Sequence, residues 1–441
     1  MASTPPKAAP APAAEALAVS AGRQRQDAIY RAGVLGRRPS VPTDPSELER
    51  RARAAMSAQA WAYVAGGAGD GGTMRANLAA FDRWAIVPRV LHDVSRRDLS
   101  VELFGRRIPA PVLVAPVGAA GLVRREADVL IGAAAAQVGA PYILSNQGSS
   151  PMEATAAAMG AAPRWFQLYW STDEQLVDSL IGRAERIGAD AIVVTLDTTM
   201  LGWRPQDLNL GSLPFARGVG IAQYTSDPRF LHLVRERVAA AAGHADDDVE
   251  VTVGTLRTLV SISRELPGRF LDNLRSPYPR AAVQTFLDIY SKPSLTWADI
   301  ATLPSRTRLP VVLKGVLHPD DAVRAVDLGM GGVMVSNHGG RQVDGAVASL
   351  DALVDVVAAV GGRVPVLLDS GVRGGADVVK ALSLGASAVA LGRSPIYGLA
   401  LDGRAGVRAV LENVIAELDL TMGLSGVASV AELGPHLLRR T

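Results

Sequence analysis

Eight short apolar runs, separated by stretches with helical spacing, constrain the fold of this chain more than any other feature. The runs are rich in valine, isoleucine and leucine and alternate little with polar residues, which is typical of strands buried on both faces of a parallel sheet. Repeated strand–helix units predict a (β/α)8 TIM barrel of class α/β. The strands are expected at residues 111–115, 142–145, 165–169, 191–197, 310–314, 332–336, 364–369 and 387–391.

Helical patterns lie between these runs and before them. A helix over 44–65, with Asp44 or Ser46 as its N-cap, is expected to form an N-terminal helical arm. Residues 1–40 are read as a disordered Ala/Pro-rich tail and arm rather than a secretory signal, and residues 41–441 as the barrel domain. The barrel helices are expected at 126–138, 173–187, 350–360 and 376–384, with another that begins at Pro319.

One connection is much longer than the others. More than 100 residues separate the fourth and fifth predicted strands, too many for a structureless loop within a domain. Residues 228–300 contain helical patterns. We therefore expect a folded lid over about 212–300, inserted into a barrel loop, with a separate small domain as the alternative.

Composition narrows the classes of function. The chain of 441 residues has a net charge of only +2, which gives no reason to expect a nucleic-acid partner or an anionic membrane surface. The chain contains no cysteine, so disulfides, thiolate metal sites and a cysteine nucleophile are excluded. No apolar run approaches the roughly 20 residues of a membrane span. We expect a cytoplasmic protein without a metal site.

A candidate base follows the sixth predicted strand. An imidazole at His338 would point into the barrel mouth, and its near-neutral pKa suits a general base. Asp197, at the end of the fourth strand, could hold the ring, and such an aspartate is expected to raise the histidine pKa and fix its tautomer. The alternative is a buried histidine with a purely structural role.

Three cations also follow strand ends. Arg341 and Arg204 could clamp a carboxylate with their planar, bidentate groups, although isolated arginines more often form surface ion pairs. Lys314 ends an apolar strand and needs an anionic partner there. A reduced flavin is one such partner, and a Schiff-base lysine or a structural ion pair are the alternatives.

The last two strands are followed by Gly-Arg pairs. Barrel enzymes often bind phosphate at this place, through backbone N–H groups and a helix N-terminus. Ordinary turns are the alternative. The residues concerned are Gly371, Arg373, Gly392 and Arg393, and further polar side chains end the third and fourth strands at Gln167, Tyr169 and Thr195.

Taken together, these residues resemble a known family, the FMN-dependent 2-hydroxy-acid oxidases and dehydrogenases. The stretch Ser-Asn-His-Gly-Gly-Arg-Gln at 336–342 is highly specific, and 166–169, 195–198 and 368–373 support it, over about 44–432 in all. Within the family the chain is most similar to the lactate 2-monooxygenases, on the segments 63–67, 98–103, 202–209 and 397–401.

The resemblance implies a role for each residue. Tyr63 and Arg341 would hold the substrate carboxylate with help from Arg204, His338 would be the base with Asp197 as its partner, and Tyr169 would bind the substrate hydroxyl. Lys314 would face the N1–C2=O edge of FMN. The other expected FMN contacts are Pro116, Val117 and Gly118 beside N5, Ser145, Gln167, Thr195 and Ser336 at the ring or ribityl chain, and Asp369, Gly371, Arg373, Gly392 and Arg393 at the ribityl chain and phosphate.

The implied activity is oxidation of an L-2-hydroxy acid with oxygen as acceptor, followed by oxidative decarboxylation of the bound keto acid, in a homotetramer or homo-octamer. The alternatives are an oxidase that releases keto acid and peroxide, a dehydrogenase that uses a quinone, a silent FMN-binding barrel, and an FMN-dependent isomerase.

Two features depart from the family pattern. Gln147 stands where glycolate oxidase has a tryptophan, which suggests that Gln147 binds a different or more polar substrate tail. The insert around 235–285 is also longer than in the lactate 2-monooxygenases. Gly118, in contrast, agrees with the monooxygenases, and its missing Cβ is expected to leave space beside the flavin.

Overall fold

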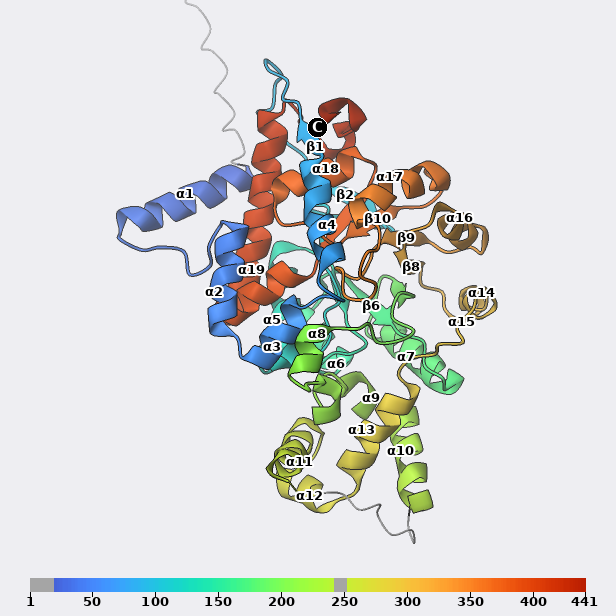
Figure 1. Cartoon of the computed structure of the whole chain (residues 1–441). Helices are drawn as coiled ribbons and strands as arrows, with labels where there is room; N and C mark the ends of the chain where they lie inside the picture. Colours follow the sequence, from blue (N-terminus) through green and yellow to red (C-terminus); the bar gives the residue numbers. More distant parts are fainter. Residues whose placement is uncertain (1–19, 242–251) are drawn as a thin grey trace, which may run out of the picture.

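The barrel is present and closed. The computed structural model describes residues 20–241 and 252–441, and its eight parallel strands pair in one ring (Figure 1). Each lies within a few residues of its predicted range, so the predicted fold class is confirmed. The strands are β4 (Val112–Val114), β5 (Tyr142–Leu144), β6 (Arg164–Leu168), β7 (Ile192–Thr195), β8 (Val311–Val316), β9 (Gly332–Val335), β10 (Val366–Asp369) and β11 (Ala388–Leu391).

Large side chains fill the barrel, and a hairpin closes its N-terminal end. Inward-facing residues of all eight strands form one buried cluster, with Trp165 among the largest of them. The hairpin of β2 (Val101–Leu103) and β3 (Arg106–Ile108) places Phe104 against Trp165, with ring centroids 5.2 Å apart. The C-terminal ends of the strands are therefore the open end, where barrel enzymes carry their sites.

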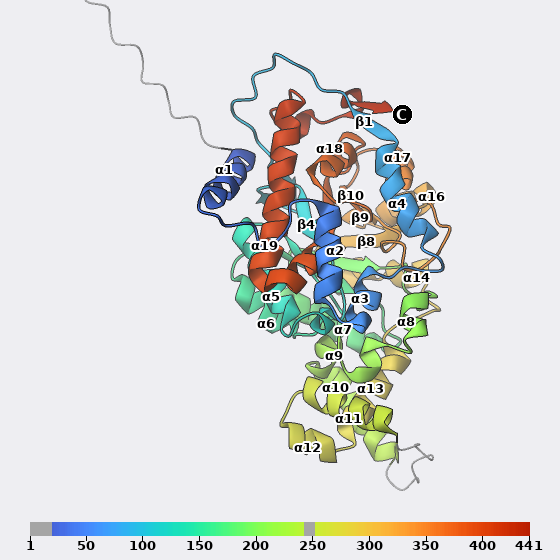
Figure 2. The same ribbon diagram turned by 60° about the vertical axis from the view of Figure 1, so that its left-hand side comes forward.

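Helices surround the barrel as expected from the strand–helix repeat (Figure 2). The last one, α19, has non-helical backbone at Asp402 and Gly403, so a short first segment follows β11 and a long second segment runs along the outside. The barrel helices are α5 (Ala127–Val138), α6 (Met152–Met159), α7 (Glu174–Arg186), α16 (Pro319–Asp327), α17 (Ser349–Val360), α18 (Gly375–Ser383) and α19 (Arg393–Leu424).

The N-terminal arm differs from its prediction. The helix expected over 44–65 is two helices, α2 (Pro45–Ala55) and α3 (Ala58–Ala65), because the Ser57 side chain caps the second by accepting a hydrogen bond from the Ala60 N–H. Ahead of them, α1 (Ala21–Val34) is anchored on α19, where the Gly22 N–H donates to Asp419 at 2.8 Å. The expected tail over residues 1–19 lies outside the described residues.

The described residues of the long connection from β7 to β8 are folded. Its aromatic residues pack on one another, with the ring of Phe286 5.3 Å from Phe215 and 5.0 Å from Tyr290. These residues belong to the same buried core as the barrel helices. The described elements are α8 (Pro205–Asn209), η2 (Pro214–Arg217), α9 (Ala222–Thr225), α10 (Pro228–Ala241), α11 (Val253–Glu265), α12 (Phe270–Arg275), α13 (Tyr278–Ile289), α14 (Trp297–Ile300) and α15 (Leu303–Arg306).

The remaining elements complete the ends of the chain. β1 (Trp84–Ile86) pairs antiparallel with β12 (Leu438–Arg440), which ties the segment before the barrel to the C-terminus. The others are α4 (Gly72–Asp82), η1 (Ala120–Leu122), η3 (Val430–Glu432) and η4 (Pro435–Leu437). Within the part of the chain that the structure describes, no helix has the length and apolar character needed to cross a membrane.

Candidate active site

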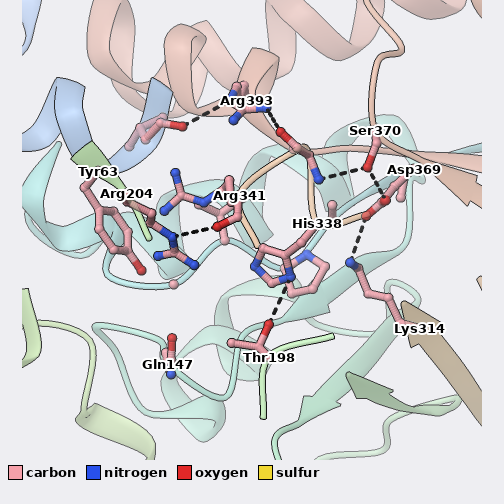
Figure 3. Close-up of a pocket in the computed structure, with 18 of the residues that line it drawn as sticks. Tyr63, Gln147, Thr198, Arg204, Lys314, His338, Arg341, Asp369, Ser370 and Arg393 are labelled. Carbon is pink, nitrogen blue, oxygen red and sulfur yellow. Dashed lines mark hydrogen bonds and ion pairs between the residues drawn. The ribbon is translucent and has the colours of Figure 1, made fainter. Parts of the chain in front are cut away.

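A cavity lies at the C-terminal end of the barrel (Figure 3). Concave sites with a few convergent polar groups are where ligands and cofactors bind. This cavity collects most of the residues singled out in the sequence because the ends of parallel strands converge there. The predicted residues on its wall are Tyr63, Pro116, Val117, Gly118, Gln147, Tyr169, Arg204, Lys314, His338, Arg341, Asp369, Gly371, Arg373, Gly392 and Arg393.

Five predicted residues do not lie on the cavity wall. Ser145 donates to Gln167 at 3.0 Å, and the Gln167 amide donates to Thr195 at 2.9 Å, so three adjacent strand ends are tied together by buried polar groups. The other two, Asp197 and Ser336, hold side chains of the wall from behind. A direct contact of these five residues with a ligand stays a prediction.

His338 is fixed by three interactions. Its Nδ1 lies 2.8 Å from Asp197 Oδ1, and the Thr198 hydroxyl, which donates to the same oxygen at 2.8 Å, lies 3.3 Å from Nδ1. The His338 N–H donates to Ser336 Oγ at 3.0 Å, which holds the residue in a left-handed conformation with φ of 57°. This conformation is uncommon for residues other than glycine. With Nδ1 occupied by Asp197, Nε2 is the nitrogen available to a substrate.

Burial controls the charge of this pair. It lowers the pKa of His338 below its ordinary value, although Asp197 acts in the opposite direction. Asp197 therefore acts in the expected direction and raises the histidine pKa, but burial outweighs it and the net shift is downward. Burial alone would raise the pKa of Asp197, but His338 and Lys314 lower it to about 2. At neutral pH the ring is neutral and the carboxylate is ionised, the state in which Nε2 can accept a proton.

Arg341 and Arg204 are adjacent cations without a carboxylate partner. The Arg341 guanidinium is partly buried and lies over the ring of Tyr63, 5.1 Å from its centroid, where it donates to the Gly66 carbonyl at 2.8 Å. Arg204 donates to the Arg341 carbonyl at 3.1 Å and to Gln342 at 2.7 Å. Among residues 20–241 and 252–441, neither forms an ion pair within 4.0 Å, so the surface ion-pair alternative does not apply.

The positive charge of Arg341 and Arg204 favours binding of an anion between them. Burial and the neighbouring Arg204 lower the pKa of Arg341 to about 9. Two adjacent cations, one buried and one partly buried, are costly unless a negative group compensates them. A carboxylate matches their planar hydrogen-bonding groups.

Lys314 has its anionic partner within the protein. Its Nζ lies 3.0 Å from Asp369 and donates to Ser336 at 2.8 Å. Burial alone would lower the pKa of Lys314, but Asp369 and Asp197 raise it. A Schiff-base lysine needs a neutral amine. The structure therefore favours a permanent cation at this position and contradicts the Schiff-base alternative.

The last two strands end in an open, cationic corner. A Cβ on Gly392 would meet nothing within 4 Å, and Gly392 caps α19, whose N-terminus points its free N–H groups there. Among the residues that the structure describes, the Arg373 guanidinium donates only to the carbonyl of Val372, at 3.2 Å. Gly371 has φ of 100°, and a Cβ there would lie 2.6 Å from the Asn77 carbonyl oxygen, so only glycine fits.

Comparison with known proteins identifies the family. The FMN-dependent dehydrogenase model matches residues 52–440. The chain is 43% identical over 416 residues to an FMN-dependent alpha-hydroxy acid dehydrogenase of Penicillium citrinum, covering 94% of this chain and 95% of the relative. It is 40% identical over 388 residues to an L-lactate oxidase of Lysinibacillus sphaericus, covering 88% and 90% of the two chains.

The chain belongs to the FMN-dependent dehydrogenase family. Among solved structures, mandelate oxidase with (S)-4-hydroxymandelic acid superposes with a TM-score of 0.73 at 35% identity, over 90% of this chain and 98% of that chain. The cofactor of the present chain is FMN, and its activity is the oxidation of 2-hydroxy acids.

The residues present fit FMN. The open corner at Gly392 and Arg373 offers a helix N-terminus and a free guanidinium to one phosphate, and Lys314 supplies a fixed cation inside the same cavity. One expectation changes. Arg393 donates to the carbonyls of Val64, Gly339 and Gly66 at 3.0–3.1 Å, so its guanidinium joins α3 to the loop after β9.

This difference predicts distinct outcomes for the two arginines. Arg373→Ala should weaken FMN binding by about 1–3 kcal/mol, the scale for losing a charged hydrogen-bond partner, with little change in apoprotein stability. Arg393→Ala should weaken FMN binding and also lower the melting temperature of the apoprotein, because it loses three backbone contacts. Fluorescence titration of FMN and thermal unfolding of both apoproteins measure this. Equal apoprotein stability would contradict the joining role of Arg393.

Several residues of the cavity wall were missed in the sequence. Thr198 directly follows Asp197, a position that could have drawn attention to it. Phe215 and Tyr290 come from the insert, and Phe215 packs edge-on against Tyr63 with centroids 6.3 Å apart. No sequence spacing indicates which aromatic residues of a long insert reach the barrel mouth.

Proposed function

We propose that this protein oxidises an L-2-hydroxy acid with oxygen as the final acceptor and oxidatively decarboxylates the keto acid while it is still bound. One observation carries the proposal. Arg341 and Arg204, which form no ion pair with a described carboxylate, share a cavity with the neutral base His338, and Phe215 and Tyr290 of the insert line the same cavity.

The residues divide the work as follows. The substrate carboxylate lies against Arg341, Arg204 and Tyr63. His338 Nε2 takes a proton from the substrate, and Asp197 stabilises the imidazolium that forms. Burial raises the pKa of Tyr169, which therefore stays protonated and donates a hydrogen bond to the substrate oxygen. FMN, when bound, accepts the two electrons of the substrate and passes them to oxygen.

The second stage depends on how long the product stays. If the keto acid remains in the cavity while peroxide is present, peroxide oxidises it to carbon dioxide, water and a carboxylic acid one carbon shorter. Tyr290 stacks on Phe286, with ring centroids 5.0 Å apart, and lines the cavity together with Phe215. We expect these two aromatic side chains, called the cover below, to slow the departure of the product.

One observation favours a second candidate, an oxidase that releases keto acid and peroxide. The space expected beside Gly118 is already taken, because a Cβ there would lie 2.9 Å from Gln147 Cβ and 3.3 Å from the Tyr63 hydroxyl. A relative of this chain is named L-lactate oxidase. A dehydrogenase with another acceptor is the third outcome of the test.

The test is anaerobic mixing with a panel of 2-hydroxy acids, followed by oxygen and product analysis without catalase. Bleaching of the flavin and then carbon dioxide with the shortened acid support the proposal. Stoichiometric peroxide and keto acid identify the oxidase. Negligible oxygen consumption, with rapid reduction of an artificial acceptor, identifies the dehydrogenase.

The cover itself can be tested. Tyr290→Ala should increase the fraction of free keto acid and peroxide several-fold, because escape then competes with the second stage. Tyr278→Ala is the matched control, since Tyr278 lies on the insert but is 41% exposed and does not line the cavity. An unchanged product ratio in Tyr290→Ala would remove the insert from the argument.

We also propose a cytoplasmic homotetramer or homo-octamer, as the family resemblance implies. Light scattering of the purified holoenzyme measures the assembly, and a monomer would contradict it.

A further inference from the structure

We propose that Gln147 makes the enzyme select 2-hydroxy acids whose side chain carries an uncharged hydrogen-bonding group, such as a hydroxyl on C3, over the matching alkyl acids. This inference rests on the proposed oxidation of 2-hydroxy acids and specifies its substrate class.

The first observation is an unused amide. Gln147 is only 6% exposed and lines the cavity. Its backbone N–H donates to Ser145 Oγ at 3.1 Å, and its backbone carbonyl accepts from the Ala119 N–H at 2.8 Å. Its side-chain amide forms no hydrogen bond with any described residue, and Figure 3 shows it without a partner below Tyr63. Buried amides are normally bonded, so this one is available to a ligand.

The second observation is where the amide lies. A Cβ built on Gly118 would be 3.2 Å from Gln147 Oε1 and 3.3 Å from the Tyr63 hydroxyl. Both polar groups therefore lie beside Gly118 and close to each other, on the wall of the cavity. A substrate whose carboxylate is bound at Tyr63 places the first atoms of its side chain within reach of the Gln147 amide.

The apolar surroundings of the Gln147 amide strengthen its effect on which substrate binds. Phe215 and Tyr290, which line the cavity from the insert, present aromatic surface. An alkyl tail would leave the amide buried without a partner, which is penalised, whereas a hydroxyl can donate to its oxygen or accept from its nitrogen. The amide is neutral and gives no compensation for a charged tail.

Gly118 helps to position the Gln147 side chain. The hypothetical Gly118 Cβ is 2.9 Å from Gln147 Cβ, closer than real Cβ contacts, so alanine there would have to displace the glutamine. Gly118→Ala should therefore reduce the same discrimination as a direct change of Gln147.

The test compares acids that differ by one hydroxyl. We expect kcat/KM for L-glycerate to exceed that for L-lactate by about tenfold, the scale of one hydrogen bond to an otherwise unpaired buried group. In Gln147→Met, which keeps length and removes the amide, the ratio should fall to about one. Gly118→Ala should lower it as well, and Gln206→Met, a change at an exposed glutamine of α8 outside the cavity wall, should keep it.

A binding measurement separates selection from chemistry. Dissociation constants of hydroxypyruvate and pyruvate, obtained from the flavin absorbance of the holoenzyme, should show the same preference in the wild type and lose it in Gln147→Met. No preference in the wild type, a preference retained in Gln147→Met, or stronger use of L-malate than of L-glycerate would overturn the proposal. If no 2-hydroxy acid bleaches the flavin, the proposed function fails, and the binding constants alone still decide on Gln147.

Discussion

His338→Gln is expected to keep its FMN and lose flavin reduction by about 10²–10⁴-fold, the usual contribution of a general base. The physical reason is that Nε2 is the free nitrogen of a ring whose Nδ1 is held by Asp197 at 2.8 Å, and glutamine offers no comparable proton acceptor. Stopped-flow mixing with substrate under anaerobic conditions measures the rate constant directly. Normal reduction in the mutant would remove His338 from the mechanism.

A control at another histidine separates this effect from a general one. His232→Gln changes a side chain on α10 that is 53% exposed, pairs with Glu236 and lies outside the cavity wall, so flavin reduction should be unchanged. FMN content after gel filtration should match the wild type in both variants. Loss of FMN in His338→Gln alone would indicate a structural role.

The pH dependence follows from the direction of the pKa shift. Burial lowers the pKa of His338, so the ring is already neutral at pH 7 and the rate of reduction should be flat above neutrality. As the pH falls through the lowered pKa, the ring gains a proton and the rate should decrease. Asp197, with a pKa of about 2, stays ionised throughout this range. A rate that rises as the solution becomes more acidic would contradict the assignment.

The fold could be predicted because its signal is repeated. Each strand is a short apolar run, and one uncertain boundary, such as 191–197 against Ile192–Thr195, does not affect the other seven. The break between α2 and α3 was missed because apolar residues continue at helical spacing across it. Its signal was local, a serine at position 57 that could cap the second helix.

The arrangement of the site was predictable only where the barrel dictates it. Residues that follow strand ends, such as His338 and Lys314, converge because the strands are parallel and close into a ring. What each side chain finds there depends on distant segments. The pairing of Lys314 with Asp369, the carbonyls around Arg393 and the filled space beside Gly118 are all set by packing, which the sequence pattern does not describe.

Arg341→Lys should lower kcat/KM for the 2-hydroxy acid by at least about 100-fold although it conserves the charge. Arg341 presents a planar group over Tyr63, and one of its nitrogens is already used by the Gly66 carbonyl. A lysine is a single point of charge and cannot hold this carbonyl and two carboxylate oxygens in one plane. Losing a bidentate, charge-assisted contact costs about 3 kcal/mol. FMN content and the anaerobic reduction rate at several substrate concentrations measure the loss.

Arg204→Lys is the matched comparison. Arg204 already donates to the Arg341 carbonyl and to Gln342, so fewer of its donors are left for a substrate. Its replacement should therefore raise KM with a smaller effect on the rate of reduction. If Arg204→Lys is the more damaging change, the two arginines have exchanged roles. If both variants behave like the wild type across the hydroxy-acid panel, the carboxylate does not bind between them, and the anion that these two adjacent cations require must be a different one.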